Sequence, residues 1–230
     1  MPILYIVATP IGNLEDLSFR ALRILREADL ILCEDTRRTR KLLSYYKIRN
    51  RVLSYHQHSK LKKLEKILKF LKEGKNLALV SDAGTPGISD PGNELIKFLI
   101  KRIPELRVIP VPGPSAITAA ASISGFFMDK FLFLGFPPTK KKRKKFFKEI
   151  ASSKYPVIFF ESPYRILKTL KQLKEVIEQC NNEGVELVVC RELTKKFEVI
   201  YRGNTEKVLE EIGPDKVRGE FVIIVNRKIT

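Results

Sequence analysis

The sequence predicts a two-domain α/β protein, with a mostly parallel sheet in the first domain and a mixed sheet in the second. In the first half, short continuous apolar runs alternate with helical patterns, which is typical of parallel strands covered by helices on both faces. The last three apolar runs of the second half are separated by short gaps or one short helix, which favours mixed or antiparallel pairing. The turn at Gly113-Pro114 separates the halves, so we expect domains at 1–113 and 114–230.

The apolar runs give the expected strands. In the first domain they are residues 3–8, 30–33, 77–81 and 107–111. The clearest helix there is 60–72, which repeats leucine and isoleucine along one face. An alanine-rich helix at 115–124 opens the second domain, whose expected strands are 131–135, 157–160, 185–190, 199–202 and 221–226.

The composition favours a polyanionic partner. The 230 residues include 43 basic and 26 acidic side chains, a formal charge of +17 that both halves share almost equally. Nucleic-acid-binding proteins often carry such an even basic surface. The alternative is a basic surface that only maintains solubility.

The cysteines and the apolar runs indicate the cellular compartment of the protein. Cys33, Cys180 and Cys190 form no CxxC pair, and two of them lie in apolar runs. We therefore expect three reduced thiols, two of them buried, in a cytoplasmic protein. The N-terminus does not resemble a signal peptide, and no apolar run approaches the length of a membrane span.

The segment 81–92 predicts a ligand-binding loop. It follows a buried strand, and its three glycines and two prolines let a ligand approach the main chain closely. Asp82 stands where it can accept hydrogen bonds from ribose hydroxyls or an amino group. A simple turn explains only the end of the segment, with Asp90 as helix N-cap and Pro91 at the first helical position.

Standard nucleotide signatures are absent from the sequence. No GxG occurs, which excludes the dinucleotide fingerprint. Residues 87–92 have P-loop spacing, but Asn93-Glu94 follows in place of Lys-Ser/Thr. Kinase and NTPase functions are therefore disfavoured.

Two further Pro/Gly turns follow expected strands, at 8–13 and 111–116. The second opens a helix, whose N-terminal amides can bind a carboxylate. Each of them alone would be an ordinary turn. Three such turns after three buried strands suggest one shared pocket edge.

Polar residues also follow three other strands. Glu34 and Asp35 precede three arginines, a combination that suits a phosphate-bearing substrate, although a helix cap with arginines in solvent explains it equally well. Glu161 precedes Ser162-Pro163, which a helix N-cap and first helical position explain locally. Glu192 follows another apolar strand. Glu161 and Glu192 are each either catalytic or part of a structural ion pair.

The segment 140–148 contains seven basic residues among nine and is expected to begin a helix after Pro137-Pro138-Thr139. Such a density of charge favours phosphate contacts over a merely solvated helix. His56 and His58 lack a third ligand, so we expect no metal site.

Taken together, segments 5–14, 33–37, 81–92, 111–115, 160–163 and 191–195 resemble the ribosomal small-subunit RNA cytidine-2′-O-methyltransferases, of the tetrapyrrole-methylase superfamily. The resemblance covers nearly the whole chain. It implies two α/β domains with S-adenosylmethionine in the cleft between them, a homodimer, and methylation of a cytidine ribose in the decoding region of 16S rRNA. Members of the family often continue into a further C-terminal segment beyond the last strand found here.

The resemblance implies the cofactor contacts, and the chemistry of the residues suggests the bases and the RNA contacts. The implied cofactor contacts are Pro10, Asp82, Ala83, Gly84, Thr85, Ser115, Ala116, Glu161 and Ser162. The candidate bases for a weakly acidic ribose hydroxyl are Glu34, Asp35, Glu161 and Glu192, which the sequence does not rank. The expected RNA contacts are Arg37, Arg38, Arg40, Lys140, Lys141, Lys142, Arg143, Lys144, Lys145 and Arg191. The alternatives are methylation of a tetrapyrrole ring and a non-catalytic RNA-binding or ribosome-assembly role.

Overall fold

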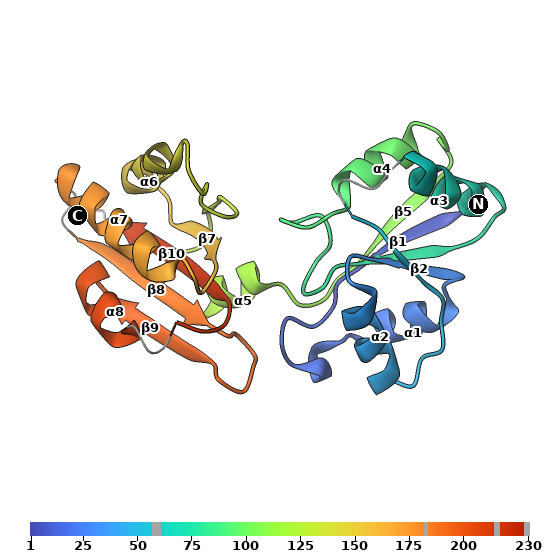
Figure 1. The fold of residues 1–230 in the computed structure, drawn as a ribbon, viewed down its shortest axis with the longest axis horizontal. Coiled ribbons are helices and arrows are strands. Elements are labelled where there is room, and N and C mark those ends of the chain that lie inside the picture. Colours follow the sequence, from blue (N-terminus) through green and yellow to red (C-terminus); the bar gives the residue numbers. More distant parts are fainter. Residues whose placement is uncertain (57–60, 182–183, 214–216, 228–230) are drawn as a thin grey trace. The chain divides into compact units, whose positions relative to one another are not determined.

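A computed structural model describes residues 1–56, 61–181, 184–213 and 217–227. The chain divides into two compact units, Met1–Ser115 (unit 1) and Ala116–Thr230 (unit 2). Figure 1 colours unit 1 from blue to green and unit 2 from green to red. The division lies close to the Gly113-Pro114 turn.

Unit 1 contains a fully parallel sheet in the order β3-β2-β4-β1-β5. The strands are β1 (Ile3–Val7), β2 (Leu30–Cys33), β3 (Val52–Ser54), β4 (Leu77–Val80) and β5 (Arg107–Val111). Four of them are the strands expected from the sequence. The additional strand β3 has only three residues, too few to produce a recognisable apolar run.

Helices cover both faces of this sheet, as Figure 1 shows. Helices α1 (Phe19–Glu27) and α2 (Thr36–Tyr45) pack on one face. Helices α3 (Leu61–Lys72) and α4 (Asn93–Ile100) pack on the other. Two separate apolar cores, one on each face, therefore stabilise unit 1.

Strand β4 shows why a central strand of this sheet is continuously apolar. Ala78 and Val80 belong to the core beneath α1 and α2, whereas Leu77 and Leu79 belong to the core beneath α3 and α4. Every residue of the strand is buried. A polar side chain at any of the four positions would therefore enter one core or the other.

Strand β5 departs from that pattern. It lies at the edge of the sheet, and its residues Arg107 and Pro110 are exposed. The expectation of burial on both faces is therefore wrong for this strand. Proline is tolerated there because an edge strand need not donate every ladder hydrogen bond.

Unit 2 contains a mixed sheet in the order β6-β7-β10-β8-β9, which confirms the predicted architecture. The strands are β6 (Leu132–Phe133), β7 (Val157–Glu161), β8 (Val185–Arg191), β9 (Val199–Gly203) and β10 (Phe221–Arg227). Strands β6 and β7 pair in parallel, and the other described pairs are antiparallel. Helices α6 (Arg143–Ser152), α7 (Ile166–Gln179) and α8 (Thr205–Ile212) share one core with the sheet. The alanine-rich helix α5 (Ala116–Ile123) lies beside β10.

Two expected helix starts are wrong. Helix α4 begins at Asn93 after Gly92, so Asp90 is not its N-cap and Pro91 is not its first residue. The preceding loop contains left-handed residues at Gly87 and Ser89 and a φ of 158° at Gly92. The helix can begin only beyond these residues, because none of the three has helical backbone angles.

Helix α7 likewise begins later than expected. Its N-cap position is Arg165, so Ser162 and Pro163 precede the helix as a turn. The carbonyl of Ser162 accepts hydrogen bonds from the backbone N–H groups of Arg165 and Ile166. The Ser162 hydroxyl accepts a hydrogen bond from the Arg165 side chain and is not a cap.

The cysteines confirm the expected burial. All three are free, with Cys33 and Cys190 buried and Cys180 exposed. Burial raises the pKa of Cys33, and it raises the pKa of Cys190 to about 11. Both buried thiols are therefore protonated and unreactive near neutral pH.

Candidate functional site

The turns that follow β1, β4 and β5 meet at the carboxyl ends of these strands in unit 1. Thr9 and Gly84 exchange backbone hydrogen bonds of 2.9 and 3.0 Å. The N–H of Ala8 donates to the carbonyl of the last residue of β5 over 3.2 Å. The hydroxyl of Thr85 donates to the carbonyl of Pro114 over 3.4 Å. The structure therefore brings together the three Pro/Gly turns that the sequence singles out.

Small side chains make this close approach possible. Gly84 has a φ of 80°, and a Cβ there would lie 3.4 Å from a methyl group of Ile11. A Cβ on Gly113 would lie only 3.0 Å from the Cβ of Ala8. The left-handed backbone favours glycine at position 84, and the close approach of Ala8 favours it at position 113.

Buried hydroxyls stabilise the same turns. Thr9 and Ser81 are almost fully buried. The Thr9 hydroxyl donates to the carbonyl of Ser81, and the Ser81 hydroxyl lies 3.1 Å from the carbonyl of Gly84. Both hydroxyls are bonded to backbone carbonyls of the loop, so they stabilise its conformation and are not available to a ligand.

Asp82 joins the turn after β4 to the start of α2, which follows the neighbouring strand β2. One carboxylate oxygen accepts the N–H of Asp35 over 3.0 Å, and the other lies 3.5 Å from the Arg38 guanidinium. The Asp82 side chain is 22% exposed. Because a carboxylate has about four acceptor positions, Asp82 retains unused lone pairs at the surface.

The two acidic residues that follow β2 differ in their contacts. Asp35 is the N-cap of α2, and its side chain accepts the N–H of Arg37 over 2.7 Å. This hydrogen bond is the main reason why the pKa of Asp35 is lowered. Glu34 is half-buried beside it and has no side-chain partner among the described residues. Of this pair, Glu34 is the carboxylate available to a ligand.

Glu161 is a structural anchor in unit 2. Only 2% of the residue is exposed. Its carboxylate accepts the N–H of Ser162 over 2.8 Å and the hydroxyl of Thr169 over 2.5 Å. It also pairs with Arg165 at 2.7 Å and, more distantly, with Arg143 at 3.8 Å. Both oxygens of this carboxylate are occupied.

Arg143 and Arg165 connect Glu161 to the segment before α6. Arg143 donates to the carbonyl of Pro138 over 3.0 Å, and Arg165 donates to the carbonyl of Pro137 over 3.1 Å. Arg143 also bonds Gln172 and is buried. The expectation that Arg143 contacts RNA is therefore wrong, because Glu161 and these acceptors hold it in the interior. The exposed members of the basic run are Lys140, Lys141, Lys142, Lys144, Lys145 and Lys148.

Thr169 and Gln172 also belong to this group, although the sequence did not predict them. A signal for them exists, because Arg165, Thr169 and Gln172 follow one another at spacings of four and three residues, from the N-cap of α7 into the helix. That spacing places polar side chains on one helix face. It becomes informative only once Glu161 is known to be buried.

Glu192 is also held by other groups. Its carboxylate accepts Lys195 and the N–H of Glu220, each over 2.9 Å. Burial opposes ionisation, but these hydrogen bonds prevail and lower the pKa of Glu192. Gly219 makes room for this side chain, since a Cβ at that position would overlap the Glu192 carboxylate. The neighbouring Arg191 donates to a backbone carbonyl over 2.7 Å.

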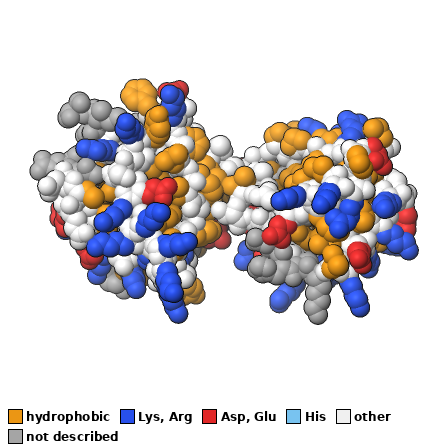
Figure 2. All heavy atoms as spheres, turned by 90° about the horizontal axis from the view of Figure 1, so that it is seen from above, with side chains coloured by type: hydrophobic (Ala, Val, Ile, Leu, Met, Phe, Trp, Pro, Cys, Tyr) orange, Lys and Arg blue, Asp and Glu red, His pale blue; other side chains and the backbone are white. Residues whose placement is uncertain are grey.

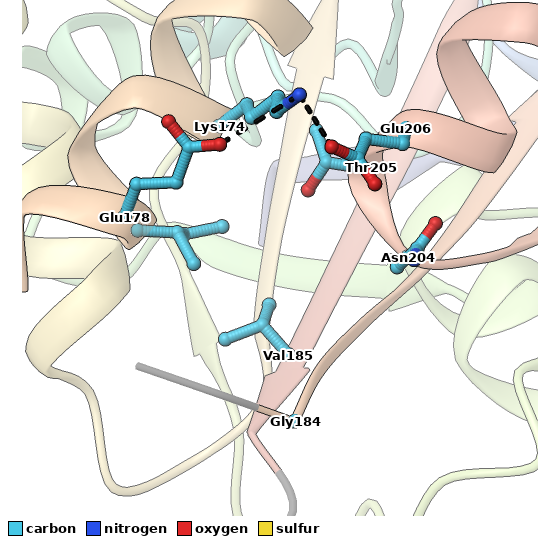
Figure 3. A pocket seen from close by; sticks show the side chains of 8 residues that line it. Lys174, Glu178, Gly184, Val185, Asn204, Thr205 and Glu206 are labelled. Atoms are coloured by element: carbon cyan, nitrogen blue, oxygen red, sulfur yellow. Dashed lines mark hydrogen bonds and ion pairs between the residues drawn. The ribbon is translucent and has the colours of Figure 1, made fainter. Parts of the chain in front are cut away.

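A small pocket of about 180 Å³ lies in unit 2 between α7, the start of β8 and the start of α8 (Figure 3). The cation that lines it is Lys174, which bonds Glu206 at 2.5 Å and pairs with Glu178 at 3.6 Å. Ligand pockets usually enclose about 300 Å³ or more. The pocket is too small and its lysine too occupied to be the main site.

The described residues contain neither a metal-binding cluster nor a membrane-spanning helix. Within the described residues, no group of three or more His, Cys, Asp or Glu side chains could hold a metal ion. Gln57 and His58 lie outside those residues. None of the described helices is both long and apolar enough to cross a membrane.

Basic side chains are spread over both units. Figure 2 shows Lys and Arg side chains across the visible face of each unit, with fewer acidic ones among them. The basic excess of the sequence is therefore not confined to one unit.

Several known proteins are similar to this chain in sequence. Residues 3–209 match the family of tetrapyrrole (corrin/porphyrin) methylases. A protein of Thermotoga maritima named ribosomal RNA small subunit methyltransferase I is 43% identical, and the alignment covers 98% of both chains. A protein of the same name from Bacillus subtilis is 44% identical over 98% of this chain and 75% of its own length.

Solved structures of tetrapyrrole methyltransferases have the same fold. A cobalt precorrin-4 methyltransferase superimposes with a TM-score of 0.71 at 19% identity, covering 97% of this chain and 94% of that one. The uroporphyrin-III-C-methyltransferase of Thermus thermophilus gives 0.64 at 18% identity, covering 96% and 93%. The chain therefore belongs to the tetrapyrrole methylase family of methyltransferases, and within it to the group named ribosomal RNA small subunit methyltransferase I.

Proposed function

We propose that the protein transfers a methyl group from S-adenosylmethionine to the 2′-hydroxyl of a cytidine ribose in 16S rRNA of the small ribosomal subunit. The observation that carries this proposal is the place in unit 1 where three main-chain turns meet beside Asp82 and Glu34. The names of these relatives supply the class of substrate. A ribosomal substrate implies a cytoplasmic enzyme.

The residues at these turns fit S-adenosylmethionine. Asp82 offers unused carboxylate lone pairs to ribose hydroxyls or the amino group. Gly84 lets a ligand approach the main chain closely. The Glu161 carboxylate in unit 2 is not available to a ligand, because both of its oxygens are already bonded. We assign the remaining contacts to Pro10, Ala83, Thr85, Ser115, Ala116 and Ser162.

Bound S-adenosylmethionine supplies an electrophilic methyl group on a sulfonium. The protein must then orient a ribose hydroxyl, and such positioning can provide much of the rate enhancement. We assign the general base, which accepts the hydroxyl proton, to Glu34. Asp35 caps a helix, Glu161 is buried in ion pairs, and Glu192 bonds Lys195. Among the four candidates, only Glu34 has a carboxylate without a partner in the described part of the chain.

Several basic side chains are placed to contact RNA. Arg37 and Arg38 lie beside Asp35 and Asp82, and the two arginine side chains are 89% and 61% exposed. The lysines at 140–142, 144 and 145 are exposed in unit 2. Arg191 is held to a backbone carbonyl, so it is the weakest of the proposed contacts.

The test of this proposal is methyl transfer from labelled S-adenosylmethionine to small subunits that lack the modification. We expect label in the RNA, and none in a tetrapyrrole precursor offered in parallel. Replacing the exposed lysines at 140–142, 144 and 145 by glutamine should suppress transfer to RNA, because phosphate contacts dominate such binding.

Two results would contradict the proposal. Label on the tetrapyrrole and not on RNA would indicate the activity named for the structural neighbours. Failure to bind S-adenosylmethionine in calorimetry would indicate a non-catalytic RNA-binding protein.

We further propose that the protein is a homodimer. Unit 2 exposes a group of large apolar side chains between α5 and the segment after β6, namely Ile123, Phe127, Phe131, Leu132 and Phe136. Large apolar side chains that remain exposed favour association. Light scattering is expected to give about twice the chain mass of 26.4 kDa. A mass of one chain at micromolar concentration would refute the dimer.

A further inference from the structure

Helix α2 exposes a face that is basic and contains no acid. Its side chains are Arg37, Arg38, Arg40, Lys41 and Tyr45, all exposed, and we call them the α2 basic face. No Asp or Glu occurs anywhere in Thr36–Tyr45. The helix buries its opposite side, so this face is the part of α2 that a partner can reach.

This arrangement is unfavourable for the helix by itself. Arg37 stands three residues before Arg40 and four before Lys41, and like charges at such spacings repel one another on a helix surface. Arg37 and Arg38 also occupy the first turn, where the helix dipole disfavours cations. A bound polyanion would relieve both effects.

The two ends of the α2 basic face differ in their ion pairs. Arg37 lies 3.8 Å from the carboxylate of Asp35, and Arg38 lies 3.5 Å from that of Asp82. Arg40 and Lys41 form no ion pair with any described residue. Their charge is therefore available to an external anion.

Tyr45 adds an aromatic surface beside these charges. The residue is 57% exposed, and its ring meets that of Tyr46 edge-on, with centroids 5.0 Å apart. Tyr46 in turn donates its hydroxyl to the carbonyl of Leu14, which holds its ring in place. An exposed, supported aromatic ring next to cations is an arrangement on which unpaired bases stack.

The direction of the helix relates this face to the reaction. The N-terminal end of α2 lies at Asp35 and Asp82, and ten residues of helix extend roughly 15 Å away from it. An RNA strand that runs along α2 would bring the neighbours of the reacting nucleotide into contact with Arg40, Lys41 and Tyr45.

We propose that the α2 basic face binds the single-stranded rRNA segment adjacent to the methylated nucleotide, with Arg40 and Lys41 on its phosphates and Tyr45 stacked on a base. This inference rests on the proposed function and extends it by giving the RNA a path over unit 1. The aromatic ring favours a single strand over a duplex, because paired bases are not available for stacking.

Helix α3 provides a matched control. Lys62, Lys66 and Lys69 are exposed on it, but α3 packs on the opposite face of the same sheet. Replacing two of these lysines removes as much charge from unit 1 as replacing Arg40 and Lys41. A difference between the two variants then reports the position of the charge and not its amount.

The experiment compares Arg40→Gln/Lys41→Gln/Tyr45→Ala with Lys62→Gln/Lys66→Gln in methyl transfer to small subunits. We expect the first variant to raise the half-saturating subunit concentration about tenfold or more, with an unchanged rate at saturation. Its plot of log affinity against log salt should be shallower by about 1.4, because each phosphate contact on a single strand contributes about 0.7. The α3 control should behave as the wild-type protein does.

Two further measurements separate stacking and folding from charge. Tyr45→Phe keeps the aromatic ring and should leave half-saturation unchanged, whereas Tyr45→Ala alone should weaken binding without altering the salt dependence. All of these variants should bind S-adenosylmethionine with wild-type affinity, which shows that each is folded.

Three outcomes would overturn the inference. The first is an α2 variant with unchanged half-saturation, and the second is an equal loss in the α3 control. The third is a loss on intact subunits without weaker binding of a single-stranded RNA oligonucleotide, which would assign the face to a ribosomal protein. Failure of the proposed function itself is recognised separately, because the wild-type protein would then transfer no label to RNA.

Discussion

Replacing Asp82 with alanine is expected to weaken binding of S-adenosylmethionine about 10- to 100-fold while leaving the fold intact. Hydrogen bonds to a charged group contribute roughly 1.5–3 kcal/mol each, and about 1.4 kcal/mol corresponds to a factor of ten in affinity. Asp82 is partly exposed and lies where the turn after β4 meets the start of α2. Calorimetric titration with S-adenosylmethionine measures the change.

Glu105→Ala is the matched control for this prediction. Glu105 is exposed in the same unit but precedes β5, so it lies toward the amino ends of the parallel strands, away from the turns at their carboxyl ends. Its replacement removes the same charge without touching the proposed site. Equal affinities of wild type and Asp82→Ala for the cofactor would remove Asp82 from the site.

The second prediction concerns Glu34 and Glu161, which are both candidate bases in the sequence but have different contacts in the structure. Glu34→Gln is expected to lower kcat about 100-fold or more, because it removes the proposed base. Glu161→Gln is expected to lower the free energy of unfolding by about 3 kcal/mol or more, because it leaves the buried Arg143 and the half-buried Arg165 without their counter-charge. Single-turnover methyl transfer and urea denaturation of both variants test the pair.

Each variant serves as the control for the other. Glu34→Gln should keep its free energy of unfolding within about 0.5 kcal/mol of wild type, as substitutions that break no buried contact usually do. Unchanged kcat in Glu34→Gln would eliminate it as the base. Unchanged stability in Glu161→Gln would show that its ion pairs do not hold this part of unit 2 together.

Much of the fold follows from local pattern. Strands β2 and β4 are buried on both faces, and their continuous apolar sequences predict this. The three turns at Thr9, Gly84 and Pro114 could be placed together because the carboxyl ends of parallel strands face the same way. Strand order is not encoded locally, which is why the exposed edge position of β5 was not predicted.

The site was less predictable, because long-range pairing decides which polar group is free. Arg143 belongs to a basic run in the sequence, yet Glu161 draws it into the interior. Glu34 follows β2 and Glu161 is the last residue of β7, and only the three-dimensional partners distinguish the two carboxylates. The start of α7 was misplaced for the same reason, since Ser162 is bonded by Arg165 and does not cap the helix.

The most direct test of the central claim is nucleoside analysis of small-subunit RNA after incubation with the protein and S-adenosylmethionine. Complete digestion followed by mass spectrometry distinguishes a methyl group on ribose from one on a base. The proposed function predicts a new 2′-O-methylcytidine in the subunit RNA, and far less of it after the same brief incubation with Glu34→Gln. A methyl group found only on a base, or no new methylated nucleoside, would contradict the account.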